Sequence, residues 1–298
     1  RRFCVDSAQT AAALRKAGLV DEEILMLHST SDREVLEQLC DLNAVCSIGT
    51  LEAGMALNSL AEGRATVIEA HLQIDCGMGF GGFPAEEPEK IVSLIRNLPN
   101  VAVSGIYTQL ASKHAMDVQL SAFQQAVDAI QAAGCETGII HAAGSYAMLR
   151  SDLSHLDAVR AGSVLLGRCR RTRGDGLLTV GRGESQVDSI RWLPKGHTVG
   201  NERHVTLRRS TRVAVIPVGY QQGYGVDKPI SGFWDAIQRL FRARRRTVRV
   251  NGQRARVLCA LGATETLLDV TGIKCSEGDT VTFDLNPLYA RGFRREYR

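Results

Sequence analysis

Three polar residues whose side chains could do acid–base or covalent chemistry stand near the ends of apolar runs. Asp75 and His141 lie at the ends of two such runs, and Lys113 follows a third. A carboxylate and an imidazole could act as acid and base, and a lysine amine could form a Schiff base. Polar residues at strand ends more often satisfy backbone groups, and most lysines in polar loops are solvated. We therefore expect Asp75 and His141 to be structural and Lys113 to be solvated.

The elements that must position these residues alternate regularly along the first half of the chain. Short apolar runs predict strands, and apolar residues three and four apart predict helices between them. A β/α alternation one unit short of eight predicts an α/β fold, an incomplete (β/α)8 TIM-type barrel that lacks its first unit. A doubly wound open sheet is the alternative. The predicted strands are residues 3–5, 23–28, 44–48, 66–75, 101–109, 138–142 and 158–166, and the helices are 8–17, 32–41, 51–62, 86–97 and 115–133.

The sequence changes character after Gly167, where arginine, glycine and β-branched residues dominate. We expect a barrel domain over residues 1–167 and an all-β C-terminal domain over 168–298, with strands at 213–218, 247–250, 256–261 and 266–270. Residues 232–246 interrupt these strands with apolar side chains at helical spacing and a run of arginines. This pattern predicts a basic amphipathic helix packed on its own β domain, with a membrane surface or an acidic partner as the alternative.

Composition narrows the class of protein. Hydrophobic residues make up 44% of the 298 residues and charged residues 23%, as in an ordinary globular protein. No apolar run reaches the roughly 18 residues of a membrane span, so we expect a cytoplasmic protein. The eight cysteines show no metal-site spacing, which favours reduced thiols and no metal. A net charge of +4 does not by itself imply nucleic acid as a partner.

A set of segments in fixed order resembles the alanine racemase family. The resemblance covers roughly residues 1–283, and an ordered set is far more specific than any single motif. The segments are residues 75–83 (DCGMGFGGF), 105–111 (GIYTQLA), 141–145 (HAAGS), 159–162 (VRAG), 216–220 (IPVGY), 250–254 (VNGQR) and 268–271 (LDVT).

The resemblance implies a β/α barrel followed by a β domain, with pyridoxal phosphate as the cofactor. It also implies interconversion of L-alanine and D-alanine, the latter for cell-wall peptidoglycan. In this family the enzyme is a homodimer in which each active site is shared between the subunits.

Part of the family's cofactor site has matching residues here. Ser145 matches a serine that binds the cofactor phosphate, and Arg160 matches the arginine that hydrogen-bonds the pyridine nitrogen. Gly162 and Ser163 could offer backbone amides to a phosphate, as is common at this end of barrels. The structural alternatives are an ion pair between Arg160 and Asp157, and a helix cap formed by Ser145.

Racemisation removes the α-proton from one face of an amino acid and returns it on the other, so it needs two bases. In the family these are a lysine on the first barrel strand and a tyrosine from the partner's β domain. The lysine motif would lie upstream of Phe3, which predicts a missing upstream segment. Asn201 occupies the place of the tyrosine and cannot act as a base. Tyr220 matches the substrate entrance, with a packed strand tyrosine as the alternative.

Other family positions in the same pocket are also changed. Phe80 stands in place of an arginine, Gln109 in place of a histidine, and Gly144 in place of an asparagine. Ala263 and Thr264 replace a methionine–aspartate pair that crosses the dimer interface. Two readings stay open: a racemase with an altered second base, and a non-catalytic scaffold that binds a cofactor, an amino acid, a membrane surface or a protein partner.

Overall fold

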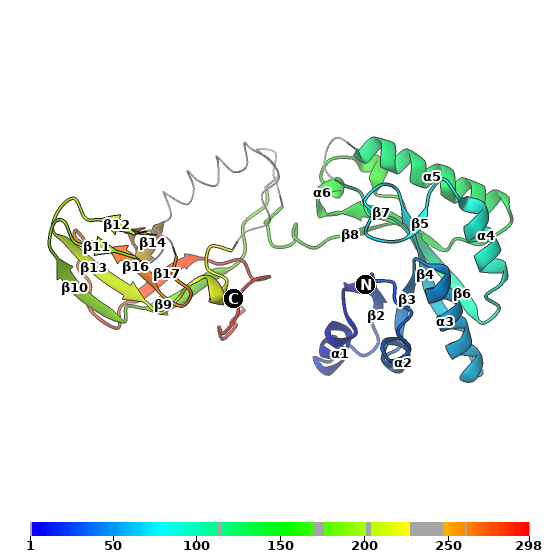
Figure 1. Cartoon of the computed structure of the whole chain (residues 1–298), viewed down its shortest axis with the longest axis horizontal. Helices are drawn as coiled ribbons and strands as arrows, with labels where there is room; N and C mark the ends of the chain where they lie inside the picture. The colour runs from blue at the N-terminus through cyan, green and yellow to red at the C-terminus, as the bar shows by residue number, and fades with distance from the viewer. Residues whose placement is uncertain are drawn as a thin grey trace. The chain divides into compact units, whose positions relative to one another are not determined.

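The computed structural model describes residues 2–111, 115–169, 176–200, 204–226, 247–259 and 261–297. The chain divides into two compact units, one made mostly of residues 1–165 and the other mostly of residues 173–298 (Figure 1). Each unit has its own hydrophobic core. The predicted basic helix at 232–246 lies outside the described residues.

The first unit is built on a parallel sheet whose strands pair in chain order. A doubly wound sheet would reverse its order part-way, so that alternative is wrong, and the prediction of an incomplete barrel is confirmed. Among the described strands, β1 pairs only with β2, and β8 only with β7. The strands are β1 (Arg2–Val5), β2 (Glu23–Met26), β3 (Ala44–Ile48), β4 (Ile68–Asp75), β6 (Val101–Tyr107), β7 (Ile139–Gly144) and β8 (Ala158–Arg160), with the short β5 (Phe83–Pro84) beside β4.

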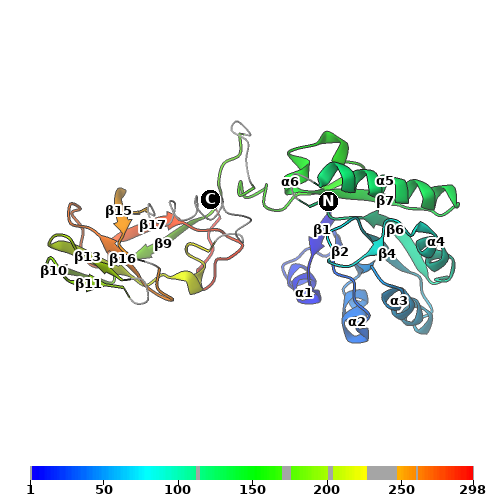
Figure 2. The same cartoon turned by 45° about the horizontal axis from the view of Figure 1, so that its top comes forward.

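Helices connect the strands, and α1 to α4 line the outer side of the sheet in Figure 2. Side-chain caps fix where three of them begin: Ser7, Asp32 and Thr50 each accept a hydrogen bond from an amide in the first helical turn. The five helices predicted for the first unit are all present, with ends that differ by at most two residues. They are α1 (Ala8–Lys16), α2 (Arg33–Asp41), α3 (Leu51–Gly63), α4 (Pro88–Arg96), α5 (Met116–Ala132) and the short α6 (Ser145–Met148).

Strand alternation separates an apolar layer from a polar interior. On β3, Ala44, Cys46 and Ile48 join the core that the helices cover. The intervening Ser47 lies on the other face, where its hydroxyl is 3.0 Å from the Tyr107 hydroxyl. The barrel interior therefore contains hydrogen-bonding side chains, among them Ser47 and Tyr107. Strand β8 is shorter than the predicted 158–166, since the amides after Arg160 leave the sheet for other partners.

The second unit is an antiparallel sheet in the order β10-β13-β16-β15-β14-β17-β9, which confirms the predicted all-β domain. The run predicted at 256–261 is wrong in its bounds, because that strand begins at Gln253 and ends at Val257. Five strands of this unit were not predicted: β9 (Arg182–Gln186), β10 (Ser189–Leu193), β17 (Thr280–Asp284) and the separate pair β11 (Thr198–Val199) and β12 (Val205–Thr206). The others are β13 (Thr211–Ile216), β14 (Thr247–Val250), β15 (Gln253–Val257) and β16 (Thr266–Asp269).

None of the described helices has the length and hydropathy that a membrane-spanning segment requires.

Gly105 on β6 provides a test of barrel packing. A Cβ atom at this position would lie 2.4 Å from Cε1 of His71, a ring held inside the barrel. We expect Gly105→Ala to lower the free energy of unfolding by about 1–3 kcal/mol through overpacking. Thermal unfolding followed by the helical circular-dichroism signal measures it.

The matched control is Gly63→Ala at the end of α3, where the added methyl group meets open space. This substitution should leave the midpoint unchanged or raise it slightly, because alanine favours the helix. Equal midpoints for the two variants would show that His71 does not occupy the position described.

Candidate functional site

The guanidinium of Arg160, at the end of β8, lies inside the barrel and is held by acceptors from β6 and β7. Burial lowers the pKa of Arg160, yet the group stays charged, as arginine does in proteins. Its Nη1 donates to Nδ1 of His141 at 2.6 Å. Its Nη2 donates to the Thr108 carbonyl at 2.6 Å, to Oε1 of Gln109 at 2.9 Å and to the Ala142 carbonyl at 3.0 Å.

The predicted alternative of an ion pair with Asp157 is wrong. The Asp157 carboxylate accepts a hydrogen bond from the Ile140 amide at 2.9 Å, and no carboxylate in the described residues pairs with Arg160. The charge of Arg160 is therefore met by neutral acceptors alone. Because no carboxylate of the described residues neutralises it, the positive charge of Arg160 can act on a ligand in the barrel.

Two buried histidines extend the network away from Arg160. Because the guanidinium can only donate, Nδ1 of His141 must accept, which leaves the His141 proton on Nε2. Nε2 lies 2.9 Å from Nδ1 of His71, which therefore accepts in turn. Burial, followed by the charge of Arg160, lowers the pKa of His141 to about 2. Burial also lowers the pKa of His71 to about 4, so both rings are neutral at pH 7.

Tyr107 on β6 closes the network on the other side. Its ring stacks on His141 with centroids 5.2 Å apart, and the guanidinium of Arg160 lies 5.5 Å from its centre. Its hydroxyl lies 2.9 Å from the Leu27 carbonyl, and burial raises its pKa to about 12. Tyr107 thus lines the site as an uncharged side chain that its hydrogen bond and ring contacts hold in place.

Ser145, the first residue of α6, bridges the ends of β7 and β8. Its hydroxyl accepts hydrogen bonds from the amides of Gly162 at 2.9 Å and Val164 at 3.3 Å. The helix is preceded by Gly144 without a side-chain cap, so the predicted helix cap by Ser145 is wrong. Two amides and a hydroxyl converge here, which is an arrangement that suits an anion. The predicted contact of the Ser163 amide with a phosphate stays a prediction.

Gly144 and Gln109, two positions where the sequence predicts a departure from the family pattern, lie beside one another. A Cβ atom at Gly144 would lie 3.3 Å from Nε2 of Gln109, whose Oε1 accepts from Arg160. Any side chain at position 144 would therefore press on the amide that holds the arginine. The sequence alone carried no sign of this contact, since 35 positions separate the two residues.

The loop that follows β4 is organised by Asp75. Its carboxylate accepts hydrogen bonds from the amides of Gly77, Met78 and Gly79 at 2.9–3.2 Å. This agrees with the predicted structural role for Asp75. Phe80 follows directly and is 80% exposed, so its ring has no packing role within the described chain.

In the second unit, the structure brings the turn that carries Tyr220 beside the loop of Ala263 and Thr264. The Tyr220 amide donates to the Gly262 carbonyl, and the Gln221 amide to the Ala263 carbonyl, each at 3.0 Å. Tyr220 is half-exposed on a 3-10 turn, so the alternative of a packed strand tyrosine is wrong. Asn201 lies outside the described residues.

No described lysine lies in the barrel interior beside this site. Within the described part of the barrel the lysines are Lys16, in the last turn of α1, and Lys90, which pairs with Glu87 on α4. Lys113 is not among the described residues. In the same described ranges, no group of three or more His, Cys, Asp or Glu could hold a metal ion.

Family models for the N-terminal and C-terminal domains of alanine racemase match residues 1–169 and 180–286. The chain belongs to the alanine racemase family. It is 30% identical over 236 residues to an alanine racemase of Carboxydothermus hydrogenoformans, covering 75% of this chain and 62% of that protein. It is 32% identical over 290 residues to a broad specificity amino-acid racemase of Vibrio vulnificus, covering 94% and 67%. The chain thus spans about two thirds of the length of these relatives.

Solved structures of alanine racemases share the fold. The enzyme from Streptomyces coelicolor A3(2) superposes with a TM-score of 0.79 at 20% identity, covering 95% of this chain and 74% of that one. The enzyme from Bartonella henselae, solved with covalently bound pyridoxal phosphate, gives 0.75 at 20% identity, covering 96% and 76%. At this identity the likeness concerns the fold.

The buried histidines make a prediction for pH. Their pKa values lie below the ordinary value near 6.5, so the unfolded chain binds more protons than the folded one as the pH falls. Stability is therefore full above about pH 6.5 and declines below it, by up to about 1.4 kcal/mol per pH unit for each histidine. Thermal midpoints measured from pH 7 to pH 5 check this.

His71→Asn keeps an acceptor near Nδ1 but cannot take a proton, so its midpoint should fall less steeply with pH. His197→Asn, an exposed position in the second unit, serves as the control and should match the parent. Parallel pH curves for the parent and His71→Asn would contradict the assignment.

Proposed function

We propose that this chain, with a barrel domain over residues 1–167 and a β domain over 168–298, is the main part of a pyridoxal-phosphate-dependent amino-acid racemase. The observation that carries the proposal is the setting of Arg160. Its two terminal nitrogens are fully engaged, while no described residue accepts a hydrogen bond from its Nε. A charged donor held this way suits a ring nitrogen that must stay unprotonated.

The residues of the barrel end fit the cofactor. Ser145 and the amides of Gly162 and Ser163 would hold its phosphate, and Arg160 would hold its pyridine nitrogen. When bound, the cofactor supplies an electron sink for the carbanion left by proton removal. Because arginine does not give up its proton, it limits that sink, which favours racemisation over side reactions.

The substrate we propose is a small amino acid, with L-alanine and D-alanine first and peptidoglycan as the use of the D-isomer. The Vibrio vulnificus relative is named a broad specificity racemase, so larger side chains belong in the same assay. Family membership also supports a cytoplasmic homodimer. Tyr220 is proposed at the substrate entrance, since its half-exposed side chain is open to solvent.

The lysine that racemisation needs is proposed to come from a strand outside residues 1–298. Strands β1 and β8 each have one described partner, so the sheet offers two free edges between which a further strand can pair.

The second candidate function is a non-catalytic scaffold. It is favoured by the barrel interior, where His141, His71 and Tyr107 hold pKa values far from neutral. In that case residues 232–246 would be tested against a membrane surface or an acidic partner.

A cofactor titration discriminates these functions. The protein translated from its native start codon should give a Schiff-base absorption band with pyridoxal phosphate, and borohydride should convert it to a stable adduct on one lysine. Peptide mapping then identifies that lysine, and chiral chromatography after incubation with L-alanine measures racemisation.

A band and an adduct without racemisation would support the scaffold that binds the cofactor. No band at saturating pyridoxal phosphate would refute the racemase proposal. Asn201→Tyr in the same protein tests whether the second base is the missing element, because it restores the family's titratable group.

Ser145→Ala tests the phosphate site by itself. Loss of one hydroxyl bonded to a charged group should weaken pyridoxal phosphate about tenfold or more, measured by equilibrium dialysis. Ser121→Ala, an exposed position on α5, is the control and should bind like the parent. Equal affinities for all three proteins would place the phosphate elsewhere.

A further inference from the structure

Asn251 and Gly252 form the turn that joins β14 to β15 in the second unit. Val250 pairs with Gln253, so the hairpin closes over these two residues alone. Both have positive φ, 49° at Asn251 and 80° at Gly252, as the common two-residue hairpin turn requires. Both residues are exposed, and a Cβ atom added at Gly252 would meet nothing within 4 Å. The tip of the hairpin is therefore open to solvent.

An asparagine that is followed by a glycine can react with its own backbone. The nitrogen of the next residue can attack the side-chain carbonyl carbon, Cγ, because the new bond closes a five-membered ring. A side chain on that next residue crowds the attack, and glycine has none. Residues 251–252 are the one Asn-Gly pair among the 298 residues of the chain. The Gly252 amide also has no acceptor in the described part of the chain, so no hydrogen bond holds it away from Asn251.

The Asn251 carboxamide, by contrast, is held by a carboxylate. Its Nδ2 donates to Oδ2 of Asp279 at 2.6 Å. The Ser276 amide donates to the same carboxylate oxygen at 2.8 Å, which fixes Asp279 in turn. A hydrogen bond to a charged acceptor is stronger than one between neutral groups. This one restrains the rotation that brings Cγ of Asn251 to the Gly252 nitrogen.

We propose that Asn251 is a deamidation site and that Asp279 limits its rate. Water or hydroxide takes the proton of the Gly252 amide, and the nitrogen forms a bond to Cγ of Asn251. The bond from Cγ to Nδ2 breaks, and Nδ2 leaves as ammonia with the returned proton, which gives a cyclic imide. Water then opens the ring at either carbonyl to leave aspartate or isoaspartate. No oxidant or reductant takes part, since one amide and one water become one carboxylate and ammonium.

The product changes the charge at the point where the hairpin meets β17. The Asn251 carboxamide donates to Asp279, whereas a carboxylate at position 251 has no proton to donate and repels the Asp279 charge. Strand β14 pairs with β17 directly beside this contact, through Val250 and Val281. Deamidation therefore destabilises the attachment of the hairpin to β17. All of these residues lie in the second unit, so the inference is independent of the racemase proposal.

Peptide mapping during incubation in mildly alkaline buffer tests the site. Trypsin releases residues 250–254 as one peptide, VNGQR. The aspartate and isoaspartate forms of this peptide should accumulate with time as two separate chromatographic peaks, each with the mass of an acid in place of the amide.

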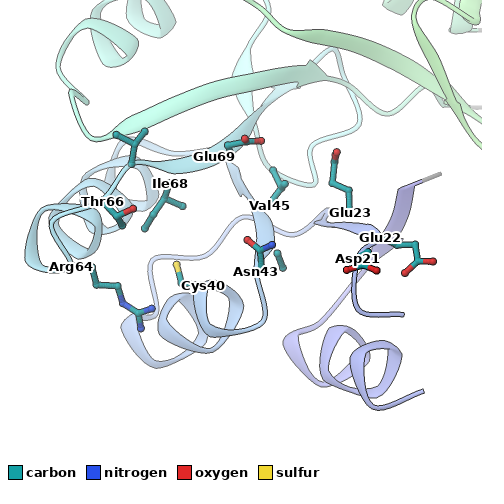
Figure 3. A pocket seen from close by; sticks show the side chains of 12 residues that line it. Asp21, Glu22, Glu23, Cys40, Asn43, Val45, Arg64, Thr66, Ile68 and Glu69 are labelled. Atoms are coloured by element: carbon teal, nitrogen blue, oxygen red, sulfur yellow. The ribbon is translucent and has the colours of Figure 1, made fainter. Parts of the chain in front are cut away.

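Asn43 is the matched reference within the same chain. It shares the exposure of Asn251 and its φ of 49°, and it lies between α2 and β3 beside a cavity of about 420 Å³ (Figure 3). The next residue is the buried Ala44, so Asn43 should stay unchanged in the tryptic peptide of residues 34–64. Conversion of Asn43 before Asn251 would refute the proposal. So would an intact Asn251 in the folded protein over a period in which the urea-unfolded chain converts half of it.

Two substitutions test the role of Asp279. Asp279→Ala removes the acceptor, so deamidation of Asn251 should be about tenfold faster. Asp279→Asn keeps a side-chain oxygen as an acceptor, and its rate should lie between those of the parent and Asp279→Ala. Asp188→Ala, at an exposed position between β9 and β10, is the control and should match the parent. Equal rates in Asp279→Ala and Asp188→Ala would contradict the restraint by Asp279.

Asn251→Asp measures the consequence of the reaction. It mimics one of the two products, so it should lower the thermal midpoint of the parent. In the Asp279→Asn background the same substitution should lower the midpoint less, because the new carboxylate no longer faces a like charge. An equal decrease in both backgrounds would show that repulsion between positions 251 and 279 is not the cause.

Discussion

The barrel of this chain depends on how one buried positive charge is held. Arg160 lies inside the sheet without a carboxylate partner in the described residues, so carbonyls and neutral side chains must meet its hydrogen-bonding needs. The carbonyls come from the ends of β6 and β7, and the arginine from the end of β8. The hydrogen bonds of one guanidinium thereby fix how the ends of three strands are aligned with one another. This alignment also positions the Ser145 hydroxyl beside the Gly162 amide.

The same requirement reaches further into the sheet. An acceptor for Arg160 must be neutral and correctly oriented. His141 meets this requirement because Nδ1 of His71 accepts the hydrogen bond that Nε2 of His141 donates. His71 in turn fits only because Gly105 has no side chain. The charge of Arg160 on β8, two imidazoles and a glycine two strands away in the hydrogen-bonding order are thus parts of one packing arrangement. Substituting any of them changes the environment of the others.

The sequence predicted the framework of this fold better than its contacts. The run at residues 44–48 is β3 with the predicted bounds. Its five apolar and small residues are typical of a short buried strand and too few for a helix. Strand β9 was missed because its sequence, RGESQ, has no apolar alternation, and it is strand only through its pairing with β17 about a hundred residues later. The partners of Ser145 and Asp157 were missed for the same reason. Both residues bond to backbone amides of segments distant in sequence, which spacing along one element cannot reveal.

The described barrel interior holds charge but does not move protons near neutral pH. His141 and His71 are neutral there, Tyr107 keeps its proton, and Gln109 has none to exchange. A histidine at position 109 would add a titratable group beside Arg160, so the glutamine makes this side of the site insensitive to pH. Gly144 allows it, because a larger residue would press on the glutamine amide. Gln109 and Gly144 are therefore best understood together, since the glycine leaves room for the amide that accepts a hydrogen bond from Arg160. Any racemase built on this barrel must then take both of its bases from outside this network.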